Sequence, residues 1–125
     1  MSDVKQEKTR YSEEELAFFE KLIDDKLEGA RKQLEFYLEQ LQEMASNPDS
    51  KVKGLDDGMS TLESERITTL AGRQKKLIQH LENAKIRIQN KVYGVCRETG
   101  KLIAKERLMA VPHATLSIEA KQGQR

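Results

Sequence analysis

Apolar residues recur every three or four positions along two long stretches of the chain, with polar and charged residues between them. This spacing places the apolar residues on one face of an α-helix and is typical of a helix packed along a narrow seam. The only polar member of either seam is Gln74. The predicted seam residues are Leu16, Phe19, Ile23, Leu27, Ala30, Leu34, Tyr37, Leu41 and Met44 in the first stretch, and Ile67, Leu70, Gln74, Leu77, Leu81, Ala84 and Ile88 in the second.

The ends of both stretches carry helix start and stop signals. A serine followed three residues later by glutamate forms a capping box, and this pattern occurs at Ser12 and again at Ser60. The first helix should end near Ala45, because the next residues favour a turn and Pro48 cannot continue a helix. Two helices of similar length joined by one connection predict a long antiparallel hairpin, a coiled coil with a tip loop at 46–59.

The chain changes character after Val92, where turn residues replace the helical pattern. Gly94, Gly100 and Pro112 mark turns, and short helices are predicted at 103–109 and 115–120. The whole chain is therefore expected to be mainly α-helical. Its expected parts are a flexible N-terminus (1–12), the coiled-coil hairpin (13–92), and a small zinc-finger-like base with a tail (93–125).

Composition narrows the range of functions. The chain is 34% charged and 37% hydrophobic with a net charge of +1, which suits narrow seams and offers no basic excess for sequence-specific DNA binding. One cysteine cannot form an intrachain disulfide, and this fits a reducing compartment. The N-terminus has no apolar core of a signal peptide, and no apolar run reaches membrane-spanning length. We therefore expect a cytoplasmic monomer with no membrane contact.

Candidate chemistry is sparse, and no enzyme is expected. Nothing resembles a nucleophile with a base and an orienting group, or a glycine-rich phosphate loop. The tip carries neighbouring carboxylates at Asp56 and Asp57, followed by Gly58. These residues are either a partner-binding acidic tip or ordinary turn residues.

The base has the frame of a zinc module. Two C-x2-C pairs separated by about seventeen residues are a zinc template, and counting from Cys96 its positions fall at Cys96, Thr99, Ser117 and Ala120. Only Cys96 is a usable ligand, so we expect no metal and no cofactor.

Two further interpretations follow from the missing ligands. A different site made of Cys96, His113 and Glu119 is conceivable, and the competing interpretation is a buried thiol with a surface histidine. Without a metal, apolar side chains should hold the base together. They are Tyr93, Val95, Cys96, Leu102, Ile103, Leu108, Met109, Val111, Leu116 and Ile118.

Four short motifs surround this frame, and together they resemble the C-terminal domain of the DksA/TraR family. They are Tyr93-Gly94-x-Cys96, Thr99-Gly100-Lys101-Leu102-Ile103, Arg107-Leu108-x-Ala110-x-Pro112 and Ala114-Thr115-Leu116-Ser117-Ile118-Glu119. In that family this domain is a C4 zinc finger, and the proteins are bacterial transcription regulators that bind RNA polymerase. This chain departs from the family pattern at three of the four ligand positions.

The resemblance also implies a role for the tip. In the family, acidic residues at the coiled-coil tip enter the polymerase secondary channel and alter the stability of promoter complexes. DksA-like members have two aspartates three apart and an alanine two residues further on. Here those positions are Lys53, Asp56 and Gly58, so one acid matches, and Asp57 is a candidate for the other.

A second family feature is a set of basic residues that bind the alarmone ppGpp. The corresponding positions here are His80, Val111 and Lys121, of which only Lys121 is a strong base. We therefore expect no strong ppGpp response. The expected function is direct regulation of RNA polymerase. The alternative is a coiled-coil adaptor that pairs with another protein and has no connection with polymerase.

Overall fold

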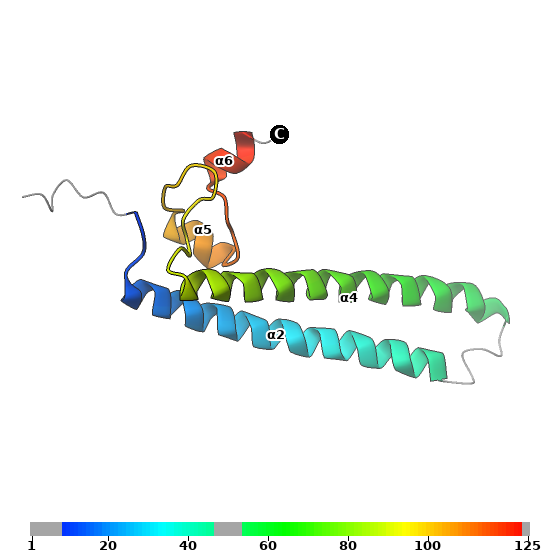
Figure 1. The fold of residues 1–125 in the computed structure, drawn as a ribbon. Coiled ribbons are helices and arrows are strands. Elements are labelled where there is room, and N and C mark those ends of the chain that lie inside the picture. The colour runs from blue at the N-terminus through cyan, green and yellow to red at the C-terminus, as the bar shows by residue number, and fades with distance from the viewer. Residues whose placement is uncertain (1–8, 47–53, 124–125) are drawn as a thin grey trace, which may run out of the picture. The chain divides into compact units, whose positions relative to one another are not determined.

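The computed structural model describes residues 9–46 and 54–123, and the side chains of residues 9–46 and 61–123. The described residues form helices joined by turns, with one isolated antiparallel bridge between Val95 and Leu102 (Figure 1). The mainly α-helical prediction is confirmed. The helices are α2 (Glu13–Ser46), α4 (Gly54–Gln89), α5 (Lys105–Ala110) and α6 (Ile118–Gly123).

Helix α2 begins at the predicted capping box. The Ser12 backbone N–H donates to Glu15 Oε1 at 2.8 Å, and the Glu15 backbone N–H donates to Ser12 Oγ at 3.1 Å. These reciprocal bonds satisfy two backbone donors that a helix start leaves without intrahelical partners. Tyr11, in the segment expected to be flexible, is buried, and residues 1–8 lie outside the described part of the chain.

Helix α4 begins at Gly54, earlier than the predicted cap at Ser60. Ser60 therefore lies inside the helix, and the capping-box prediction is wrong at this position. Residues 54–59, which were predicted to belong to the tip loop, are helical. Residues 47–53 lie outside the described residues.

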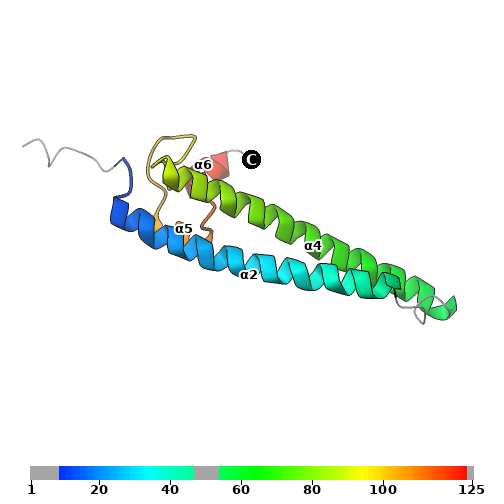
Figure 2. The ribbon, with the colours of Figure 1, turned by 60° about the horizontal axis from the view of Figure 1, so that its bottom comes forward.

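The chain divides into two compact units, each of which contains a part of both long helices. Unit 2 is Leu27–Gln79, in which a stretch of α2 runs antiparallel to a stretch of α4 (Figures 1 and 2). Leu27, Ala30 and Ile67 are buried at the seam, as predicted. The other seam residues of this unit are half-buried, namely Leu34, Tyr37, Leu41, Met44, Leu70, Gln74 and Leu77.

Unit 1 combines Met1–Lys26 with His80–Arg125. Its core joins the seam of both long helices to the base, and the Phe19 ring centroid lies 5.3 Å from that of Tyr93 and 5.7 Å from that of Tyr11. The Tyr11 hydroxyl donates to the Ile103 carbonyl, and the Tyr93 hydroxyl donates to the Pro112 carbonyl at 2.8 Å. These rings therefore fix the turns of the base to the helices.

The predicted core of the base is partly wrong. Met109 and Ile118 are 52% and 51% exposed. The buried residue of α5 is Leu108, and α6 buries none of its residues. The short helices themselves begin later than predicted, at Lys105 and Ile118. Among the described residues, no helix has the length and apolar character needed to cross a membrane.

Candidate functional site

Hydrogen bonds connect the frame positions of the base to one another and to the Cys96 thiol. Cys96 is buried, and the Ser117 backbone N–H donates to its Sγ atom at 3.3 Å. Ser117 Oγ accepts the Ala120 backbone N–H at 3.1 Å, and Thr99 Oγ1 accepts the Lys101 backbone N–H at 3.2 Å. Hydrogen bonds thus join residues at all four positions to their neighbours.

The environment of Cys96 favours the thiolate. Burial raises the pKa of the thiol. Hydrogen bonds from the Thr99 hydroxyl and from the backbone N–H groups of Ser117, Thr99 and Glu98 together outweigh this effect and lower the pKa to about 6. A buried anion stabilised in this way does not need a counter-ion nearby. Cys96 is thus buried, as expected from the sequence. The lowered pKa of its thiol was not predictable from the spacing of the frame residues.

The structure does not gather the alternative metal site. In residues 9–46 and 54–123, no three side chains of the histidine, cysteine, aspartate or glutamate types are placed to hold one metal ion. Cys96, His113 and Glu119 all belong to this described region, so they do not form a site.

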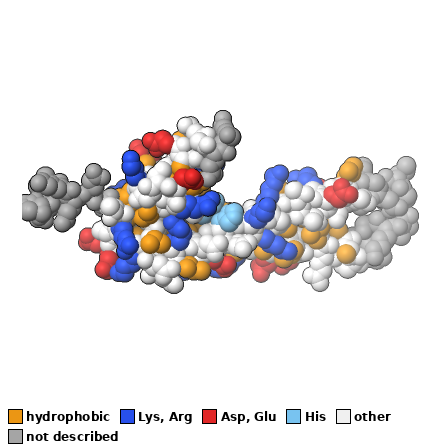
Figure 3. Space-filling view, turned by 45° about the horizontal axis from the view of Figure 1, so that its top comes forward, with side chains coloured by type: hydrophobic (Ala, Val, Ile, Leu, Met, Phe, Trp, Pro, Cys, Tyr) orange, Lys and Arg blue, Asp and Glu red, His pale blue; other side chains and the backbone are white. Residues whose placement is uncertain are grey.

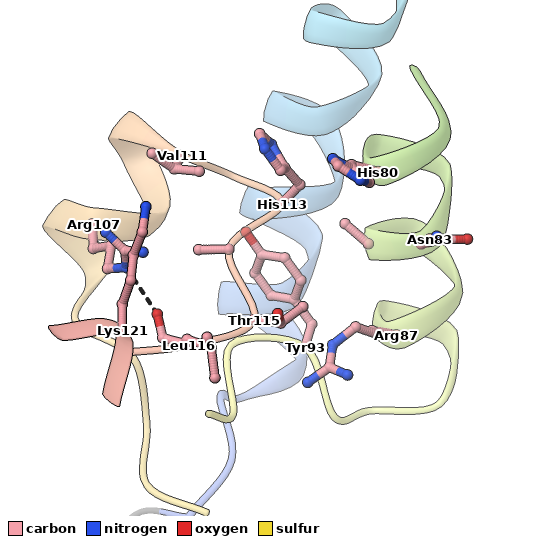
Figure 4. A pocket seen from close by; sticks show the side chains of 12 residues that line it. His80, Asn83, Arg87, Tyr93, Arg107, Val111, His113, Thr115, Leu116 and Lys121 are labelled. Atoms are coloured by element: carbon pink, nitrogen blue, oxygen red, sulfur yellow. Dashed lines mark hydrogen bonds between the residues drawn. The ribbon is translucent and has the colours of Figure 1, made fainter. Parts of the chain in front are cut away.

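A pocket of about 330 Å³ lies in unit 1 beside α4, α5 and α6 (Figure 4). Its charged lining consists of Arg87, Arg107 and Lys121, and no carboxylate side chain lines it. On the face shown in Figure 3, histidine and basic side chains are exposed next to one another. The lining residues are His80, Asn83, Ala84, Arg87, Tyr93, Arg107, Val111, His113, Ala114, Thr115, Leu116 and Lys121.

Two arginines of this lining hold backbone carbonyls. Arg87 donates to the Val95 carbonyl at 2.9 Å and the Val92 carbonyl at 3.3 Å. Arg107 Nε donates to the Leu116 carbonyl at 2.8 Å. These contacts fix the turns that carry the frame, so each guanidinium has a structural role in addition to its charge.

The histidines form a pair that sequence reasoning missed. The rings of His80 and His113 stack with centroids 5.4 Å apart and planes at 24°. His113 is half-buried, and its Nδ1 atom is buried without a hydrogen-bond partner, so the expected surface histidine is wrong. Burial, and secondly the neighbouring His80, lower the pKa of His113.

The positions singled out by the resemblance fall into two groups. His80, Val111 and Lys121 are brought together in the lining of the pocket. Asp56, Asp57 and Gly58 lie near the start of α4, where their side chains are outside the described set. Lys53 precedes the helix and lies outside the described residues.

Comparison with known proteins extends this description. Residues 91–124 match the family model described as prokaryotic dksA/traR C4-type zinc finger. General stress protein 16O of Bacillus subtilis is 33% identical over 106 residues, which are 82% of this chain and 63% of that protein. The RNA polymerase-binding transcription factor DksA of Caulobacter vibrioides is 46% identical over 50 residues, or 40% of this chain and 35% of that protein. The chain thus spans less than two thirds of either relative.

A solved structure supports the fold along most of the chain. Transcription factor DksA2 from Pseudomonas aeruginosa superposes with a TM-score of 0.79 at 28% identity. The match covers 87% of this chain and 81% of DksA2, so it includes helices as well as the base.

The family match corrects the prediction that the protein has no cofactor. A C4-type zinc finger over residues 91–124 indicates zinc binding in the family, and the expected absence of a cofactor is contradicted by that finding. The residues at the frame do not supply a C4 donor set, because Cys96 is the single cysteine of the chain and Thr99, Ser117 and Ala120 hold the other positions.

The base motif and the fold along the long helices thus lead to the same assignment. The family model matches residues 91–124, and the DksA2 superposition covers most of the chain. The match at residues 91–124, the relatives and the DksA2 fold together support the assignment of this chain to the DksA/TraR family.

Proposed function

We propose that this protein binds RNA polymerase directly and regulates transcription. The observation that carries the proposal is the superposition on transcription factor DksA2 over 87% of the chain. The match of the base to the dksA/traR model and the likeness to an RNA polymerase-binding transcription factor from Caulobacter support it. These named relatives are transcription factors, and on this proposal the protein is no enzyme.

The proposed mechanism assigns the polymerase-facing role to the tip. Unit 2 consists of two antiparallel helical segments, and such a pair is narrow enough to enter a channel that would exclude a globular domain. Asp56, Asp57 and Gly58 lie near the start of α4. Inside the secondary channel, carboxylates at these positions would change the electrostatic field around a catalytic site that uses metal ions. The expected result is altered stability of promoter complexes.

The low net charge of the chain favours direct contact with polymerase over sequence-specific DNA binding. The net charge is +1, whereas duplex-binding domains carry an excess of lysine and arginine that displaces phosphate counterions. On this proposal a single copy of the protein acts on polymerase and reads no promoter sequence itself.

The test compares the wild type with the Asp56→Asn, Asp57→Asn double variant in polymerase binding and in promoter-complex lifetime. Glu39→Gln with Glu43→Gln is the matched control, because it removes two charges from exposed positions of α2. We expect all three proteins to bind polymerase and only the tip variant to lose the effect on lifetime. Failure of the wild type to bind polymerase would contradict the proposal and favour the coiled-coil adaptor.

A further inference from the structure

The histidine pair joins two segments that are distant in sequence. His80 belongs to α4, while His113 lies in the segment between α5 and α6, and their rings stack with centroids 5.4 Å apart (Figure 4). They are the only two histidines in the chain. The stack therefore joins the 111–117 segment to α4.

The surroundings of His113 suit a neutral ring. A neutral imidazole has one N–H donor and one acceptor nitrogen, whereas a protonated ring has two donors that both need acceptors. His113 Nδ1 is buried and has no partner. The neighbouring Pro112 carbonyl already accepts from the Tyr93 hydroxyl at 2.8 Å, so the backbone beside the ring is held in place. A proton on Nδ1 would therefore create a buried donor without an acceptor.

The pocket that the pair lines is surrounded by positive or neutral groups. The lining contains His80 and Arg87 from α4, Arg107 from α5 and Lys121 from α6, with Tyr93 in the turn after α4. No aspartate or glutamate lines the pocket, and α2 adds no side chain to the lining. Protonation of His113 would therefore add a positive charge to a pocket lined by three permanent cations, with no carboxylate in the lining to balance it.

We propose that His113, stacked on His80, is a proton-sensitive latch, which holds the 111–117 segment on α4 while its ring is neutral and releases the segment when the ring is protonated. The direction follows from linkage. The pKa of His113 is lowered by burial and by His80, so the latch is at full strength above the ordinary histidine pKa of about 6.5 and weakens as pH falls below it.

The released segment would carry the frame with it. The Thr115 carbonyl accepts the Arg97 backbone N–H at 2.9 Å, and the Ser117 backbone N–H donates to Cys96 Sγ at 3.3 Å. The Leu116 carbonyl accepts from Arg107 Nε at 2.8 Å. Opening at His113 therefore exposes backbone groups that join the base to the Cys96 loop.

Amide hydrogen exchange of the full chain at about pH 7.5 and about pH 5.5, corrected for intrinsic rates, tests the latch across the histidine range. The reporter is the Arg97 amide. The control is the Ile103 amide, which donates to the Gly94 carbonyl at 2.7 Å, because neither residue of this bond belongs to the 111–117 segment. We expect Arg97 exchange to accelerate about tenfold at the lower pH, which is the order of effect expected when one buried donor is left without an acceptor. Ile103 exchange should change little.

His113→Gln should abolish the acceleration, because glutamine does not titrate. Nuclear magnetic resonance titration of the wild type should give a pKa for His113 below the ordinary value. If His113→Gln does not fold, His80→Gln provides the test. Removal of His80 should raise the pKa of His113 and reduce the acceleration of Arg97 exchange. Equal pH responses in the wild type and the variant that folds, or an ordinary pKa for His113, would overturn the proposal.

Discussion

The backbone N–H of Ser117 donates a hydrogen bond to Cys96 Sγ across 3.3 Å. This contact joins the first and third positions of a zinc-finger frame through a thiol and a backbone amide. The Thr99 hydroxyl and further backbone N–H groups bond the same sulfur. The loop around Cys96 is thus an anion-stabilising environment built by the chain itself.

Thr99→Val should raise the pKa of Cys96 from its value of about 6, because valine keeps the shape of threonine and removes the hydroxyl donor. The measurement is thiolate absorbance during a pH titration of chelator-treated protein. Thr115→Val is the control, since the Thr115 hydroxyl accepts from Arg97 Nε at 3.2 Å and serves a different partner. An unchanged thiol pKa in Thr99→Val would contradict the assigned cause.

The same substitution should have a pH-dependent effect on stability. A thiol whose folded pKa lies below its unfolded pKa stabilises the fold fully above the unfolded value, and this contribution is lost as pH falls through the folded value. Thr99→Val should therefore lower the free energy of unfolding more at about pH 9 than at about pH 6. Urea unfolding at both pH values measures the difference, and equal losses would count against the thiolate account.

Gly94→Ala should destabilise the base more than Gly100→Ala. Both glycines have positive φ, 79° and 74°, so alanine costs about 1–2 kcal/mol at either position. At Gly94 the new Cβ would also lie 2.6 Å from ring carbons of Tyr11, whereas nothing lies within 4 Å at Gly100. We expect a further loss of about 1–3 kcal/mol at Gly94 from this overlap, measured by urea unfolding. Equal losses would contradict the close Tyr11 contact.

Lys91→Gly should be more stable than Lys91→Ala by about 1 kcal/mol. Lys91 has φ of 63° at the end of α4, where the Val92 N–H bonds the Arg87 carbonyl at 2.9 Å and the Lys91 N–H bonds the Ile88 carbonyl at 3.0 Å. Both variants lose the exposed ion pair with Glu13, so their difference isolates the backbone strain. Thermal unfolding checks it, and an equal or lower stability of the glycine variant would contradict the strain.

Local signals predicted the parts of the fold that local interactions determine. The Ser12 capping box needs only Glu15, and both form the expected bonds. The same signal failed at Ser60, because the preceding residues also form helix despite Gly54 and Gly58. Each glycine costs only about 1 kcal/mol in a helix, and acidic residues such as those that follow Gly54 favour a helix start.

The parts of the candidate site that depend on tertiary contacts were not predictable. The stack of His80 on His113 requires the base to fold back onto α4, and no spacing in the sequence encodes that contact. The exposure of Met109 depends in the same way on which side of α5 meets the core. The frame around Cys96 was predictable in position, because template spacing identified its members, but the hydrogen bonds to its sulfur were not.

Localised cleavage from the polymerase active centre tests the central claim most directly. Fe²⁺ replaces the catalytic Mg²⁺ of polymerase and generates hydroxyl radicals that cut only nearby chain. The account predicts that the bound protein is cleaved close to Asp56 and Asp57 and is not cleaved in the base. Binding to polymerase with no cleavage at the tip, or with cleavage at the base, would contradict insertion of the tip into the secondary channel.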